Sequence, residues 1–174
     1  GIYINDIDVV IITHSHLDHN ADAKTISSLV YDLNSYNQRK NKIVKDVFEL
    51  SNNKEHTITW IVDGISKQEL RHNIKNVKDL KTFLGRKKQL IEGNKGIKMS
   101  AISTKHIKDN VETYGIRLFA DYGDELSIGY TSDTAFFQEL ETFYSGSDIL
   151  VFNVSFSKIS LISLCLLYVF LPIG

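Results

Sequence analysis

Cysteine is nearly absent from this sequence, because Cys165 carries the only thiol among 174 residues. A single cysteine excludes a disulfide within the chain and a zinc site built from cysteines alone. Cys165 lies in an apolar run, where a small buried thiol is the ordinary interpretation. The lone thiol fits a reducing compartment, so we expect a cytoplasmic location.

Other features of specialised chains are also missing. The sequence has no internal repeat, no low-complexity linker and no apolar run of the ~20 residues that a membrane-spanning helix needs. It shows no signal peptide, but it begins with Gly1 rather than Met, so the sequence does not decide targeting. With 43% apolar residues, the chain can bury one hydrophobic core, and we expect one domain.

The sequence lacks an excess of either charge, since the net charge is −1, but the positive and negative residues are unevenly distributed along the chain. Residues 39–117 carry a charge of +9, and the rest of the chain carries −10. A basic middle segment favours a phosphate-bearing substrate, although lysines on solvated helix faces give the same count.

Apolar periodicity predicts that strands and helices alternate. Residues 8–13 form a short run of β-branched side chains, which favours a strand covered on both faces. Apolar residues at helical spacing follow over about 22–36. Residues 57–63 alternate, with Ile58, Trp60 and Val62 inward, and predict a second strand.

The pattern after this strand predicts a long helix and then a β-rich half. Ser66 and Glu69 form a capping box, and apolar residues at helical spacing extend the predicted helix to Leu84, where Gly85 stops it. Further along, the patterns predict a turn at 93–96, a strand at 97–104, a hairpin with arms at 115–121 and 125–130 around a tip at 122–124, an acidic-capped helix over about 134–144 and a buried strand at 148–154. This order indicates an α/β or α+β class with layered sheets.

Three of the six histidines fall within one six-residue window, together with an aspartate: His14, His16, Asp18 and His19. In an extended segment His14 and His16 point the same way and can grip one ion, while Asp18 and His19 lie where the chain turns and can reach a second. Imidazole with carboxylate suits zinc, and the lack of cysteine ligands favours a catalytic site over a structural one. The alternative is a His-rich capping loop that merely ends the strand.

The pattern His-x-His-x-Asp-His after an apolar strand resembles the signature of the metallo-β-lactamase superfamily. The resemblance implies the metallo-β-lactamase fold, a four-layer αβ/βα sandwich with metals at the sheet edges. It also implies two metal ions, which we expect to be Zn²⁺, with Mn²⁺ or iron as alternatives. It does not select a reaction, because members cleave lactams, thioesters, phosphodiesters and RNA.

Two further ligands are implied by the resemblance. His106, followed by Thr-Tyr-Gly-Ile-Arg at 113–117, resembles the third ligand histidine of the ribonuclease Z-like branch; the alternative is a satisfied surface or core histidine. The run Gly-Tyr-Thr-Ser-Asp-Thr at 129–134 resembles the bridging-aspartate loop, so Asp133 is expected between the metals, with a helix N-cap as its alternative role. His56 and His72 lie on polar segments and are expected to be solvated.

Part of the family pattern is missing at the second metal. No histidine follows His106, so the family's last ligand histidine has no counterpart here. Phe152-Asn153 stands where relatives often carry a His-Glu pair. The second metal is therefore left with three side chains, namely Asp18, His19 and Asp133.

Both ends of the chain also depart from the family pattern. The first strands of the family's first sheet are absent before residue 8, and the apolar residues 159–173 do not resemble the closing helix. We expect a partial metallo-β-lactamase domain at 1–158, incomplete at both ends, and an apolar tail at 159–174, as in a truncated or frame-disrupted gene product. The alternatives for the tail are a core-seeking segment and a membrane anchor.

The expected function is hydrolysis by a zinc-activated hydroxide. Asp18 is the expected catalytic residue, since it would orient this nucleophile while Asp133 bridges the metals. The contexts of His106 and Asp133 and the basic middle segment favour a phosphoester or RNA-type substrate, either a small molecule or a nucleic acid. The alternatives are a β-lactam or thioester hydrolase and a non-catalytic remnant that binds one metal.

Overall fold

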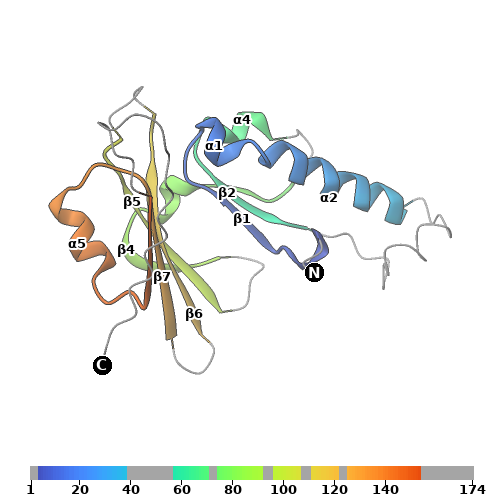
Figure 1. Ribbon diagram of the computed structural model, residues 1–174. Helices are drawn as coiled ribbons and strands as arrows, with labels where there is room; N and C mark the ends of the chain where they lie inside the picture. Colours follow the sequence, from blue (N-terminus) through green and yellow to red (C-terminus); the bar gives the residue numbers. More distant parts are fainter. Residues whose placement is uncertain are drawn as a thin grey trace.

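Two β-sheets face each other in the computed structural model (Figure 1). Sheet A is parallel, in the order β1-β2-β3, and sheet B has the order β4-β5-β6-β7-β8. Sheet B is antiparallel except for its last pair, β7 and β8. The strands are β1 (Val9–Ile12), β2 (Thr59–Val62), β3 (Val77–Asp79), β4 (Gly85–Leu90), β5 (Ile97–Ser103), β6 (Tyr114–Asp121), β7 (Glu125–Asp133) and β8 (Ile149–Asn153).

The structure describes residues 4–38, 57–70, 74–91, 96–106, 111–121 and 125–153. Several expectations fall outside these ranges: the environments of Cys165, His56 and His72, the turn at 93–95, the hairpin tip at 122–124 and the tail at 159–174. Among the described residues, no helix is both long and apolar enough to cross a membrane.

Helices cover the outer face of each sheet. The helices α1 (Leu17–Asn20), α2 (Ala23–Gln38) and α4 (Ser66–Glu69) lie beyond sheet A, and α5 (Gln138–Tyr144) lies beyond sheet B (Figure 1). Apolar clusters join the layers. Ile61 of sheet A packs with Met99 and Ile116 of sheet B, while Trp60 and Val62 face the α2 side. The predicted four-layer αβ/βα sandwich is therefore confirmed.

Strand β2 is buried on both faces, whereas its sequence pattern predicted one buried face. All four of its residues are buried, with Ile61 facing sheet B and its neighbours facing the helices. The expected inward alternation of Ile58, Trp60 and Val62 describes only the helix-facing side. A central strand between two layers has no solvent face, which is why its neighbours are apolar as well.

The predicted long helix from Ser66 to Leu84 is wrong. Helix α4 ends at Glu69, and Val77 instead pairs with Trp60 as part of β3, followed by the 3-10 turn η2 (Leu80–Phe83). The expected capping box is also wrong, because the Asp63 carboxylate accepts the backbone N–H groups of Ile65 and Ser66 at 2.9 and 3.1 Å. Tertiary pairing with an apolar neighbour strand thus overrides helical spacing.

Two other predicted elements need smaller corrections. Helix α5 begins at Gln138, four residues later than the expected start at 134, because Ala135 first forms a bridge with Lys105. Asp133 therefore is not the N-cap of that helix, whose N-cap is Phe137. Strand β8 is half-buried rather than buried.

Strand direction decides which chain segments meet at one edge of the molecule. Strands β5 and β7 are each antiparallel to β6, so they run the same way and end at the same edge of sheet B. His106 follows β5, and Asp133 is the last residue of β7. The bridge between Lys105 and Ala135 holds these two segments together.

Candidate metal centre

The loop after β1 brings three histidines to the edge where β5 and β7 end. The rings of His14 and His16 have centroids 4.8 Å apart, and those of His14 and His19 are 4.1 Å apart. His106 joins them from sheet B, with ring centroids 5.8 Å from His14 and 4.8 Å from His16. Four imidazoles from both sheets therefore share one small volume.

Asp133 lies between two groups of these side chains. Its Oδ2 is 3.8 Å from His14 Nε2, and its Oδ1 is 3.3 Å from His19 Nε2. Asp18, whose side chain is 76% exposed, lies on the solvent side, 3.6 Å from His19 Nε2. The two oxygens of one carboxylate thus face different imidazoles.

The side chains form two possible metal-binding groups that share Asp133. The first is His14, His16, His106 and Asp133, and the second is Asp18, His19 and Asp133. In each group the candidate ligand atoms lie within 4.8 Å of one another. All six residues expected from the sequence are therefore brought together, and their role as ligands stays a prediction.

Unsatisfied ring nitrogens in the first group fit a metal ion. His14 Nε2 and His106 Nε2 are buried, and neither has a hydrogen-bond partner within the part of the chain that the structure describes. A buried nitrogen without a partner carries a desolvation cost, and a bound cation would offset it. Borderline-soft imidazole nitrogens with a carboxylate form a donor set that suits zinc.

The protonation state of His14 also suits a ligand. Burial, followed by the nearby His19, lowers the pKa of His14 to about 4. The ring is therefore neutral at pH 7, and the neutral imidazole is the form whose ring nitrogen binds a metal.

Two hydroxyl groups hold the other side of the His14 ring. Ser132 Oγ donates to Thr13 Oγ1 at 2.8 Å, and both oxygens lie 3.3 Å from His14 Nδ1. Ser132 is fully buried and has a φ of 55°, a left-handed conformation that is uncommon for serine. Contacts of this kind fix the orientation of a ligand histidine and leave Nε2 facing the metal position.

Two asparagines support the remaining parts of the cluster. Asn20 Nδ2 donates to Ser15 O at 3.0 Å and to Glu69 Oε2 at 2.9 Å, which ties the histidine loop to α4. Asn153 Nδ2 donates to Asp133 Oδ1, because β8 runs parallel to β7 and places these residues side by side. The sequence marked Asn153 only as a departure from a pattern, and it gave no signal for Asn20 or Ser132.

Comparisons with known proteins identify the family and the fold. A family model described as "Beta-lactamase superfamily domain" matches residues 3–162. The metallo-beta-lactamase fold protein YhfI from Bacillus subtilis is 19% identical, with a TM-score of 0.53 over 84% of this chain and 50% of that chain. A possible metal-dependent hydrolase from Veillonella parvula is 13% identical, with a TM-score of 0.51 over 87% of this chain and 52% of that chain.

The similarity to the two solved structures extends over only part of those proteins. The chain spans about half the length of both solved structures, and at such identities the likeness shows the fold alone. A search of curated proteins gave no match.

Proposed function

The chain belongs to the β-lactamase superfamily and has the metallo-β-lactamase fold, and from this premise we propose that it is a hydrolase that uses two divalent metal ions. The observation that carries the proposal is the pair of donor groups that share Asp133. A carboxylate shared between two groups of donor side chains is the arrangement that a two-metal site needs.

Each clustered side chain has a proposed role. His14, His16 and His106 would hold the first ion, and Asp18 with His19 would hold the second. Asp133 would contact both. Zn²⁺ is the expected metal, with Mn²⁺ or iron as alternatives, because the donors are imidazole nitrogens and carboxylate oxygens.

The chemistry follows from these positions. When bound, the ions would supply a Lewis acid that polarises a carbonyl or phosphoryl oxygen and makes water acidic enough to attack near neutral pH. Asp18 is exposed at the solvent side of the cluster, where a carboxylate can orient the attacking water by accepting a hydrogen bond. Ser132 and Thr13 would keep His14 in one orientation during turnover.

We propose a phosphoester, as a small molecule or as RNA, for the substrate. The support is the basic segment 39–117, which includes the exposed Lys105 next to His106. Lysine contacts with phosphate would make binding weaken as salt is added. A lactam or thioester substrate remains the alternative, and an activity that ignores ionic strength would favour it.

One observation favours a second candidate, a remnant that binds a single metal without turnover. The second group has only three side chains, and Asn153 already donates to one oxygen of Asp133. A carboxylate oxygen that accepts this bond has less capacity for a second ion.

Metal content and turnover separate the two candidates. The whole chain is loaded with zinc and dialysed, metal is counted by mass spectrometry, and hydrolysis of bis(p-nitrophenyl) phosphate is followed. Asp133→Asn is the test variant, and Asp121→Asn, at an exposed position on β6, is the matched control. We expect two zinc ions per chain and a loss of at least ~100-fold in turnover with Asp133→Asn alone. One weakly held ion and no turnover would support the remnant.

A further inference from the structure

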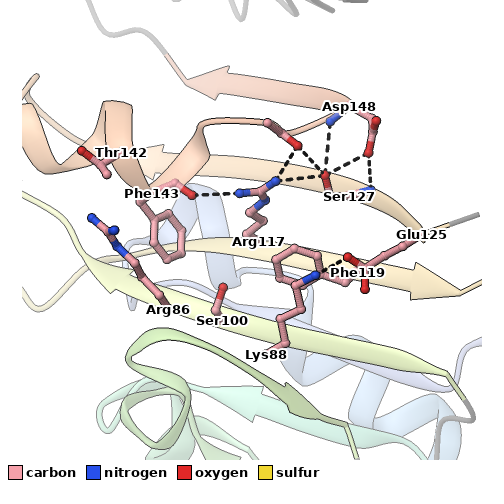
Figure 2. A pocket seen from close by; sticks show the side chains of 11 residues that line it. Arg86, Lys88, Ser100, Arg117, Phe119, Glu125, Ser127, Thr142, Phe143 and Asp148 are labelled. Atoms are coloured by element: carbon pink, nitrogen blue, oxygen red, sulfur yellow. Dashed lines mark hydrogen bonds and ion pairs between the residues drawn. The ribbon is translucent and has the colours of Figure 1, made fainter.

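The outer face of sheet B carries a polar cavity of about 340 Å³ beside the carboxyl end of α5 (Figure 2). Outward-facing residues of β4 to β7 line it, because alternate residues of these strands point away from the inter-sheet core. Five charged side chains contribute to the lining: Arg86, Lys88, Arg117, Glu125 and Asp148. None of the proposed metal ligands is among the lining residues.

Most of these charges are already engaged. Lys88 pairs with Glu125 and lies over the Phe119 ring, with its Nζ 4.3 Å from the ring centroid. Asp148 accepts two hydrogen bonds from Ser127, from its backbone N–H at 2.7 Å and its hydroxyl at 2.9 Å.

Arg117 is also engaged, and its role here is structural. Its guanidinium donates to the carbonyl oxygens of Phe143, Ser145 and Gly146 at 3.2, 2.8 and 2.6 Å. It therefore satisfies carbonyls at the end of α5, as basic groups do at helix carboxyl ends. These contacts hold Arg117 against the end of α5, where both line the cavity.

Among the described residues, the Arg86 guanidinium and the Ser100 hydroxyl have no hydrogen-bond or ion-pair partner, and the Nε of Arg117 is also buried without one. Ser100 is only 2% exposed, and its hydroxyl lies between Arg86 and Lys88 in the view of Figure 2. Three cations against two carboxylates leave an excess of one positive charge around this hydroxyl. A free guanidinium and a free hydroxyl donor, in a preformed cavity, match an oxyanion.

We propose that this cavity binds a phosphate group, held by the Arg86 guanidinium and the Ser100 hydroxyl with Lys88 nearby. The site goes beyond the proposed metal-dependent hydrolysis and does not depend on it. The phosphate can be free or carried by a nucleotide, since the recognising groups contact only its oxygens.

The test is a titration of the whole, zinc-loaded chain with inorganic phosphate, followed by backbone amide NMR. We expect saturable shifts at Ser100 and Arg117, with apparent affinity reduced ~10-fold by Arg86→Ala and several-fold by Ser100→Ala. Lys87→Ala, an exposed cation on the same strand that does not line the cavity, should leave the affinity unchanged. Phosphate that binds only at the metals would shift the His14 and His106 amides instead, so the two sites are read separately.

Adenosine 5′-monophosphate and adenosine distinguish the sources of the phosphate. Tighter binding of the monophosphate than of inorganic phosphate indicates a nucleotide, and equal binding indicates the phosphate group alone. The proposal is overturned if adenosine gives the same shifts, if Ser100 and Arg117 do not shift, or if Lys87→Ala weakens binding as much as Arg86→Ala does.

Discussion

Replacing Ser132 tests whether its hydroxyl orients His14 for metal binding. Ser132→Ala removes the donor to Thr13 Oγ1 and the oxygen 3.3 Å from His14 Nδ1, while the backbone stays in place. Loss of a group that supports a metal ligand lowers metal affinity by ~10 to 100-fold. We expect this loss for zinc, measured by competition with a chelator, and a loss of about 1 kcal/mol in the free energy of unfolding from one buried hydrogen bond.

The variant Ser132→Gly separates the hydroxyl from the backbone conformation. The φ of 55° is unfavourable for serine and alanine but not for glycine, so Ser132→Gly should be more stable than Ser132→Ala by roughly 1 kcal/mol. Both variants should bind zinc equally weakly, because both lack the hydroxyl. Ser103→Ala, at an exposed position on β5, is the control. Wild-type zinc affinity in either Ser132 variant would refute the role assigned to the hydroxyl.

Two other predictions concern sheet B. Gly129→Ala should lower the free energy of unfolding by about 1 to 3 kcal/mol, because the added Cβ would lie 2.6 Å from both Leu150 Cδ1 and Tyr144 Cδ1. Urea denaturation measures this change, and unchanged stability would contradict this close packing. The pKa of Asp148 is lowered mainly by the hydrogen bond from the backbone N–H of Ser127 and further by the bond from the Ser127 hydroxyl. The carboxylate therefore stabilises the fold above the unfolded pKa of ~3.9, and this stabilisation is lost as the pH falls through the lower folded pKa. Below about pH 4, the free energy of unfolding of Asp148→Asn should therefore decrease less steeply with falling pH than that of the wild type. An unchanged slope would count against these hydrogen bonds.

The sequence predicted the histidine loop after β1 because its site residues are neighbours in the chain. His14, His16, Asp18 and His19 lie within six residues, and the apolar strand before them is recognisable from its β-branched run. The resemblance to a known family supplied the expectation for His106 and Asp133. The structure adds the physical reason that they meet the loop, since β5 and β7 end at one sheet edge.

Non-local pairing explains what the sequence did not predict. Leu70, Val77 and Leu80 fit helical spacing, yet Val77 lies in a strand, because apolar spacing alone does not separate a helix from short strands and turns. Ser132 and Asn153 act through contacts with residues far away in the chain, which periodicity does not encode. Asn20 likewise reaches Glu69 across 49 positions.

Zinc anomalous diffraction from crystals of the metal-loaded chain tests the central claim most directly. We predict two peaks about 3.5 to 4 Å apart, one among His14, His16 and His106 and the other beside Asp18 and His19, with Asp133 within bonding distance of both. Zinc peaks that lie elsewhere, or no ordered zinc at these side chains, would contradict the account.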